Sequence, residues 1–216
     1  RPIYATPFTA EILKIKMEER GLRHVPIEVV EPGGVAQIGS FKVQFVPVSH
    51  SVPDACALII ETEHGRVVHS GDWNLDPAPI VGSPTDAQYF KDAAAKGVLA
   101  YIGDSTNAEV DGYSGSESDV EKGLEAEFAL HKGRIAVTSF SSNIGRVISI
   151  VKAAQANGRS VGVIGRSLHR MIGAARDLGM LKDCPEFVSE GDLESIPDDQ
   201  LVVILTGSQG EYRAAL

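Results

Sequence analysis

The sequence predicts an α/β (α+β) chain in which a β-rich half precedes a half of alternating strands and helices. Up to about residue 107, short apolar runs are separated by turn signals, a pattern that favours a meander of antiparallel strands. Beyond that point apolar runs alternate with helical segments, which indicates parallel βαβ units. We therefore expect two domains, residues 1–107 and residues 108–216, the second with a mainly parallel sheet flanked by helices.

The first half is expected to open with a helix, because Thr6 and Pro7 resemble an N-cap followed by proline at the first helical position. This helix should run to Gly21. The remaining elements expected in this half are strands over residues 27–30, 41–48, 56–60, 66–69 and 98–102 and a helix over residues 85–96. The last strand is apolar throughout, so we expect it to be buried.

The second half is expected to open with a helix at Ser116, because the spacing from Ser116 to Asp119 resembles a capping box. The elements that should follow are strands over residues 135–139, 161–164 and 201–205, helices over residues 144–156 and 168–178, and the start of a helix at residues 213–216.

His50 and Asp72 are the first candidates for a functional site. They follow the strands over 41–48 and 66–69, which are the outer two of an up-down-up meander and therefore end at one edge of the sheet. An imidazole and a carboxylate are good ligands for Zn²⁺ or Mn²⁺, and an aspartate can bridge two ions. The structural alternatives are that Asp72 caps a turn and that His50 bonds the backbone. The spacing alone leaves both open.

Two further acids belong to the same region. Asp104 follows the strand over 98–102 and adds a carboxylate at another strand end. Asp54 could accept a hydrogen bond from His50 and so orient its ring. A turn role after Pro53 explains Asp54 equally well.

Residues 139–143 are candidates for binding phosphate. They follow a strand and open a helix, so their hydroxyls and N–H groups would face an anion at a helix N-terminus. Capping by Ser142 would be a purely structural role, but Ser139 and Ser141 exceed what capping needs. Arg166 lies at the next junction of this kind, in Gly-Arg-Ser, and two adjacent junctions would line one crevice. The glycine-rich motifs of dinucleotide and nucleoside-triphosphate sites are absent from the sequence.

The charge is distributed unevenly along the chain. Residues 132–182 contain nine basic residues and one acid, a net charge of +8, which leaves −17 for the rest of a chain whose net charge is −9. This asymmetry suggests a surface that faces phosphates beside an acidic, metal-attracting remainder. Ordinary solvated arginines on helix faces would give the same count.

Other features limit the class of protein. No apolar stretch approaches the roughly 20 residues that cross a bilayer, so we expect no membrane partner. The chain has two cysteines, too few for a disulfide framework, and no signal peptide. We expect a cytoplasmic protein. Because the chain begins without methionine, we also expect it to be a piece of a longer protein.

The motifs around His50 and Asp72, His-Ser-Val-Pro-Asp and Gly-Asp-Trp-Asn-Leu-Asp, resemble the later metal motifs of the metallo-β-lactamase superfamily. Four further motifs are similar to those of its β-CASP nucleases, especially the ribonuclease J group: residues 104–108, residues 116–117, residues 139–143 with Arg146, and residues 206–211. The resemblance covers essentially the whole chain. It implies a partial metallo-β-lactamase β-sandwich half followed by a β-CASP domain.

The resemblance also implies a function. Members of this group are expected to hydrolyse RNA phosphodiester bonds as 5′-to-3′ exonucleases and endonucleases, with two zinc ions, or manganese, and as homo-oligomers. His50 matches the histidine that binds one metal, Asp72 matches the aspartate that bridges both, and Glu117 matches the acid of the first β-CASP motif. The residues expected to contact RNA phosphates are Ser139, Ser141, Ser142, Asn143, Arg146 and Arg166.

The chain departs from the family pattern at its ends. The His-x-His-x-Asp-His cluster that supplies most ligands is absent and would lie before Arg1, and the later histidine motif would lie beyond Leu216. We therefore expect this fragment by itself to be inactive.

Two other functions stay open on the sequence. A metallo-β-lactamase-type hydrolase of small esters or thioesters would not need the basic segment. A non-catalytic RNA-binding scaffold would have no histidine cluster upstream.

Overall fold

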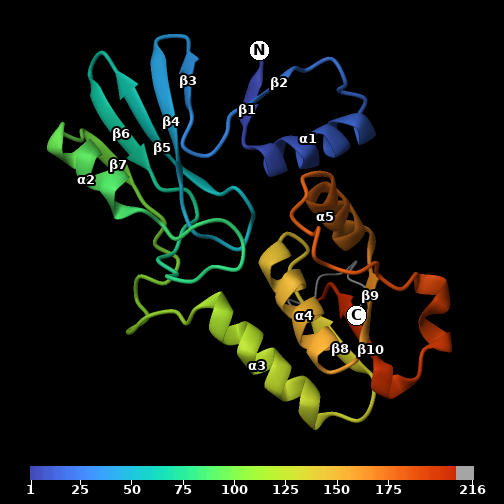
Figure 1. Cartoon of the computed structure of the whole chain (residues 1–216). Helices are drawn as coiled ribbons and strands as arrows, with labels where there is room; N and C mark the ends of the chain where they lie inside the picture. Colours follow the sequence, from blue (N-terminus) through green and yellow to red (C-terminus); the bar gives the residue numbers. More distant parts are fainter. Residues whose placement is uncertain (208–216) are drawn as a thin grey trace. The chain divides into compact units, whose positions relative to one another are not determined.

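The computed structural model describes residues 1–207, which contain both helices and strands, as the predicted α/β class requires (Figure 1). The chain divides into two compact units. The first comprises Arg1–His50 with Asp54–Ser114, and the second comprises Ser51–Pro53 with the chain from Gly115 onward. The boundary expected near residue 107 lies within the first unit. Four residues of the motif over 206–211 and the helix expected at 213–216 lie outside the described residues.

The first unit contains a five-stranded sheet of order β3-β4-β5-β6-β7. Its strands are β3 (Val35–Ile38), β4 (Phe41–Pro47), β5 (Cys56–Thr62), β6 (Gly65–His69) and β7 (Ala100–Ile102). The strands β4, β5 and β6 pair antiparallel, so the predicted meander is confirmed. Because β7 joins β6 in parallel, the carboxyl ends of β4, β6 and β7 lie at the same edge. The short strand β3 was not predicted.

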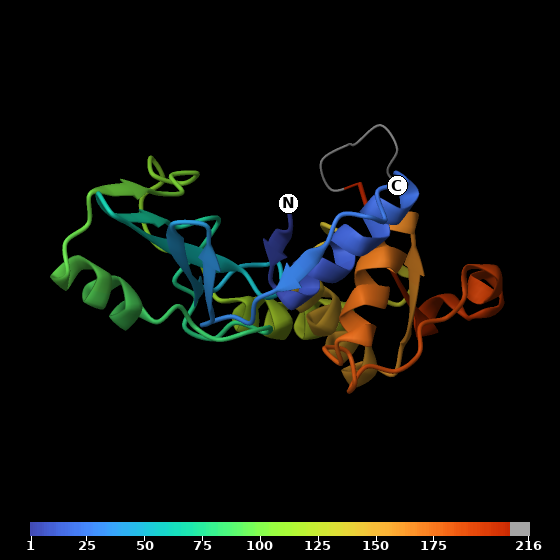
Figure 2. The ribbon, with the colours of Figure 1, turned by 90° about the horizontal axis from the view of Figure 1, so that it is seen from above.

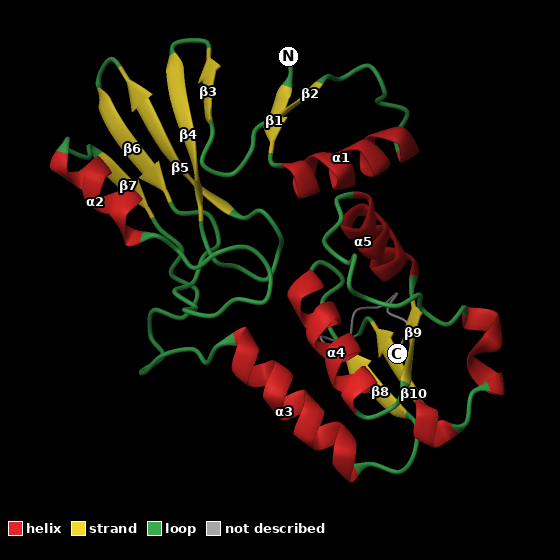
Figure 3. Cartoon of the chain, viewed as in Figure 1, coloured by secondary structure: helices red, strands yellow, loops and turns green. Residues whose placement is uncertain are grey.

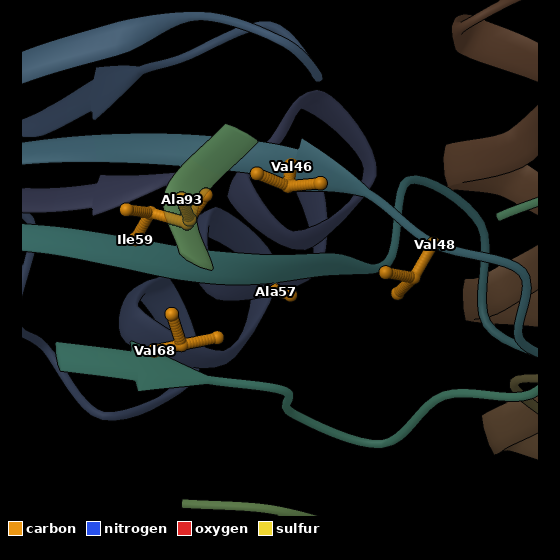
Figure 4. Close-up of a cluster of buried hydrophobic side chains, with 6 residues drawn as sticks. All are labelled: Val46, Val48, Ala57, Ile59, Val68 and Ala93. Atoms are coloured by element: carbon orange, nitrogen blue, oxygen red, sulfur yellow. The ribbon is translucent and has the colours of Figure 1, made fainter. Parts of the chain in front are cut away.

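One face of this sheet carries the unit's core. The helix α2 (Ala87–Ala95) lies along that face (Figure 2). Its Ala93 packs with apolar side chains of β4, β5 and β6, as Figure 4 shows for Val46, Ile59 and Val68. At one end of this cluster Trp73 packs against Phe90 of α2, with ring centroids 5.4 Å apart. The core therefore fixes the chain on one side of Asp72.

The prediction that the strand over 98–102 is buried is wrong. All three residues of β7 are exposed, and Tyr101 retains 56% of its accessible surface. The reason is position: β7 is the last strand of the sheet, and within residues 1–207 it pairs only with β6. Apolar composition alone could not distinguish an edge strand from a central one.

The first unit also contains a two-stranded parallel sheet of β1 (Ile3–Ala5) and β2 (Ile27–Val29), joined by α1 (Pro7–Glu19). Thr6 is the N-cap of α1, as predicted, and proline occupies the first turn. The hydroxyl of Thr6 does not cap the helix, however. The N–H of Phe8 instead donates to Oδ2 of Asp54, at 3.1 Å. The strand β1 was not predicted.

The second unit is built on a three-stranded parallel sheet of order β8-β10-β9, with β10 in the centre. Both strand pairings are parallel, as predicted, and helices separate the strands along the sequence (Figure 3). Its elements are α3 (Glu117–Leu130), β8 (Ile135–Thr138), α4 (Ile144–Ala156), β9 (Ser160–Ile164), α5 (Arg166–Asp177), η1 (Glu190–Ser195), η2 (Asp198–Gln200) and β10 (Leu201–Leu205).

Close packing fixes two of these elements. The helix α4 is embedded through Ile144, Val147 and Ile150, all fully buried. The short helix η1 approaches β9 at Gly162, where an added Cβ would lie 2.2 Å from Cδ2 of Leu193. Glycine at this position therefore permits the contact that holds η1. Among residues 1–207 no helix is both long and apolar enough to cross a bilayer.

Candidate functional site

The first candidate site is the edge at which β4, β6 and β7 end. His50, Asp72 and Asp104 follow these three strands in the chain. An isolated bridge pairs Ser49, the residue before His50, with Asn74, which follows Asp72 closely. The structure thus brings the segments of His50 and Asp72 together, as the meander predicted.

A threonine hydroxyl fixes these two segments. Oγ1 of Thr85 accepts a hydrogen bond from the N–H of Ser49 at 2.8 Å and donates one to the carbonyl of Asn74 at 2.8 Å. The N–H of Asn74 donates to the carbonyl of Ser49 at 2.9 Å. Thr85 was expected to begin a helix, but α2 begins at Ala87 with Asp86 as its N-cap. Thr85 instead holds together the chain segments that carry His50 and Asp72.

Replacing Thr85 with valine should lower the free energy of unfolding by about 1–2 kcal/mol, because the N–H of Ser49 and the carbonyl of Asn74 each lose a partner. Chemical denaturation of the chain measures this change. Thr85→Ser keeps the hydroxyl and is the matched control. Equal stability of the valine variant and the parent chain would contradict the proposed bridge.

A buried serine connects the next pair of strand ends. Ser70 is fully buried; its hydroxyl donates to the carbonyl of Gly71 at 2.7 Å and accepts from the N–H of Asp104 at 2.8 Å. The N–H of Ser70 donates to the carbonyl of Ile102. The turn that follows requires the positive φ of Gly71, 61°. Ser70 therefore sets the spacing between the segments that carry Asp72 and Asp104.

The environment of Asp104 favours its charged form. The hydroxyl and the N–H of Thr106 donate to its carboxylate at 2.6 and 2.9 Å and hold the pKa of Asp104 below its usual value. The N–H of Trp73 and the charge of His50 lower this pKa further, by smaller amounts.

Asp54 has a contact of a different kind from the one expected. It adopts a positive φ of 57°, and its carboxylate anchors the start of α1 through Phe8. This contact gives Asp54 a structural role in the turn after Pro53. Orientation of His50 by Asp54 stays a prediction.

The residues at this edge fit a metal ion in kind but are too few in number. Imidazole and carboxylate are ligands of Zn²⁺, and Asp72 is exposed. Yet among residues 1–207 no group of three or more His, Cys, Asp and Glu side chains is arranged to hold a metal ion. Catalytic zinc sites use three protein ligands. Metal binding by His50 and Asp72 therefore stays a prediction.

The second candidate site is the junction between β8 and α4. The N-cap of α4 is Asn143, whose Oδ1 accepts from the N–H of Arg146 at 2.8 Å, so capping by Ser142 is wrong. Ser139 is buried, with 7% of its surface exposed, and its hydroxyl donates to the carbonyl of Phe140. Ser141 and Ser142 are partly exposed. Contact of these residues with RNA phosphates is untested and stays a prediction.

Arg146 is engaged by a carboxylate. Its Nε and Nη2 donate to the two oxygens of Glu117 at 3.2 and 3.0 Å. Both side chains are about three-quarters buried. The structure thus joins two residues of separate β-CASP-like motifs in a forked ion pair between the N-terminal ends of α3 and α4.

Four of the nine basic residues of the segment over 132–182, Arg146 among them, form ion pairs with acids among residues 1–207. The other partners are Asp198 for Arg134, Glu121 for Lys152 and Glu186 for Arg176. Arg159 is buried and donates to backbone carbonyls. Residues 115–207 contain ten Lys and Arg and thirteen Asp and Glu. The net charge of +8 over residues 132–182 therefore does not describe the surface of the folded unit.

Two basic residues line a pocket at the carboxyl ends of β9 and β10. Its volume is about 490 Å³, and its lining residues are Ile164, Gly165, Arg166, Ser167, Arg170, Glu190 and Thr206. Sequence reasoning identified Arg166 at this junction. It missed Glu190, which follows an irregular segment and carries no motif.

Comparison with known proteins agrees with this architecture. Residues 132–216 match the family described as ribonuclease J, β-CASP domain. The whole chain is 44% identical, over 216 residues, to Ribonuclease J of Sinorhizobium meliloti, of which it covers 38%. It is 37% identical, over 218 residues, to Ribonuclease J of Thermus thermophilus, again covering 38% of that protein.

The fold also matches a crystal structure of a protein of unknown function from Enterococcus faecalis V583. The TM-score is 0.67 at 16% sequence identity, and the match covers 96% of this chain and 54% of that one. The family match identifies residues 132–216 as a β-CASP domain. The whole chain is similar to proteins named Ribonuclease J, so the resemblance that the motifs predicted is confirmed. It spans well under half the length of these ribonuclease J relatives.

Proposed function

We propose that the protein to which this chain belongs is a metal-dependent ribonuclease that hydrolyses RNA phosphodiester bonds by 5′-to-3′ exonucleolytic and endonucleolytic cleavage. The observation that carries the proposal is that the strands preceding His50, Asp72 and Asp104 end at the same edge of one sheet, in a chain similar throughout to proteins named Ribonuclease J.

In this proposal His50 would hold one metal ion and Asp72 would be a ligand of both, with zinc as the expected metal and manganese as the alternative. Two such ions would polarise the scissile phosphate and activate the attacking water. The remaining ligands come from outside residues 1–207. Thr85 and Ser70 position the segments that bear His50, Asp72 and Asp104 through the hydrogen bonds described above.

RNA binding belongs to the second unit. Ser141, Ser142 and Arg166 have the exposure that contact with phosphate requires. Arg146 and Glu117 contribute through the ion pair that joins α3 to α4. A cytoplasmic location and homo-oligomerisation of the full-length protein complete the proposal and rest on the family resemblance alone.

The test is the metal content and cleavage activity of the full-length protein. We expect about two zinc or manganese ions per chain, on the two-metal scheme. We also expect cleavage of 5′-monophosphorylated RNA that a chelator abolishes and added metal restores. RNA binding without metal or cleavage would favour the scaffold, and ester hydrolysis without RNA cleavage would favour the small-molecule hydrolase.

A further inference from the structure

The pocket beside α5 is lined by side chains of opposite charge, two arginines and a glutamate. Arg166 and Arg170 lie on its α5 side, together with the hydroxyl of Ser167. Glu190 lines it from η1, and Thr206 lines it at the end of β10. Its volume, about 490 Å³, lies in the range of small-molecule sites. A ligand that fills it would contact both cationic side chains and the carboxylate.

Glu190 is held in this position from two directions. Its Oε1 accepts from the N–H of Gly165, at 3.4 Å, and pairs with Nε2 of His169, at 3.1 Å. The packing of Leu193 against Gly162 fixes the short helix that begins with Glu190. The carboxylate is thus directed toward the N-terminus of α5 and remains half exposed.

The chemistry of these groups restricts the ligand. Arginine guanidinium groups favour phosphate. An ionised carboxylate accepts hydrogen bonds only, so it disfavours a bare phosphate and requires a donor. A ribonucleotide offers both: a phosphate, and a ribose hydroxyl that can donate. Carboxylates bind ribose hydroxyls in this way at the strand ends of dinucleotide-binding sheets.

We propose that this pocket binds one ribonucleotide unit of RNA, with the phosphate toward Arg166 and Arg170 and the ribose 2′-hydroxyl donating to Glu190. The 2′-hydroxyl is the group by which proteins distinguish RNA from DNA. The pocket therefore selects ribose, and Glu190 is its specificity-determining residue. This inference rests on RNA as the ligand of the proposed function.

The test compares the affinities of the 216-residue chain for a short RNA, the DNA of the same sequence and the 2′-O-methyl RNA, measured by fluorescence anisotropy with a chelator present. Chelation removes any contribution of metal. The chain should bind RNA about tenfold more tightly than DNA, the value of one charge-assisted hydrogen bond. The 2′-O-methyl RNA lacks the donor and should bind as weakly as DNA.

Single substitutions show which residue gives the preference for RNA over DNA. Glu190→Ala should bring the affinity ratio of RNA to DNA close to one without weakening DNA binding. Glu194→Ala removes the same charge from the same short helix, outside the pocket lining, and should leave the ratio unchanged. Arg166→Ala should weaken RNA and DNA binding equally. A ratio of one in the parent chain, or equal effects of the two glutamate variants, would overturn the inference.

These outcomes separate the inference from the proposed function. Cleavage of RNA by the full-length protein together with no ribose preference in this chain would remove the role of Glu190 and leave the ribonuclease intact. A ribose preference that depends on Glu190, in a protein that cleaves no RNA, would support the pocket and reject the ribonuclease.

Discussion

Replacing Asp72 with alanine in the full-length protein should reduce RNA cleavage by more than about 100-fold. This lower limit is conservative, because removing a residue that only hydrogen-bonds a metal ligand already lowers metal affinity or activity by about 10–100-fold. Loss of the Asp72 carboxylate, which is itself a proposed ligand, should lower cleavage by more than this. Initial rates on 5′-monophosphorylated RNA measure the loss, and the metal content per chain should fall in parallel. The side chain of Asp72 is exposed, so the stability of the fold should not change.

The matched control is Glu63→Ala. Glu63 is an exposed acid in the turn between β5 and β6, at the end of these strands opposite to the candidate site. Its loss should leave both cleavage and metal content unchanged. Cleavage by the Asp72→Ala protein at the parent rate would remove Asp72 from the site and leave it as a turn residue.

The position of the candidate site could be predicted from local patterns. Short apolar runs and turn signals identified β4, β5 and β6, and an up-down-up order then requires His50 and Asp72 to share an edge. The groups that hold this edge could not be predicted. Ser70 and Thr85 act on residues far from them in sequence, and a lone serine or threonine in a loop carries no local signal.

The second unit was predicted more accurately than the first. Residues 144–156 and 201–205 form α4 and β10 as expected, and residues 201–205 could be recognised because their apolar run is uninterrupted. The strands β1 and β3 were missed since they are too short for periodicity to show. The burial of β7 was mispredicted because burial depends on the neighbouring layer and not on the strand itself.

The basic segment shows the largest difference between sequence and structure. A charge count along residues 132–182 omits the acids of α3, η2 and the segment before η1, which pair with its lysines and arginines. Ion pairs between elements distant in sequence are invisible to such a count. Arg166 and Arg170 are the two cationic side chains that line the pocket at the carboxyl ends of β9 and β10.

Arg159 is the clearest example of a basic residue with a structural role. It is 7% exposed, and its guanidinium donates to the carbonyls of Gly133 at 2.8 Å and Asp198 at 3.4 Å. It also donates to the carbonyl of His131, the C-cap of α3, where a cation complements the helix dipole. One side chain thus connects α3, the segment before β8 and the η2 helix.

Replacing Arg159 with methionine should lower the free energy of unfolding by about 3 kcal/mol, because carbonyls that accept from a charged donor lose it in a buried site. Chemical denaturation measures the change. Lys182→Met removes an exposed charge from the same segment and should have an effect below about 0.5 kcal/mol. Under conditions in which the variant is folded, its affinity for RNA should equal that of the parent chain, because the guanidinium is occupied by carbonyls. A lower affinity for RNA with an unchanged free energy of unfolding would show that Arg159 contacts RNA.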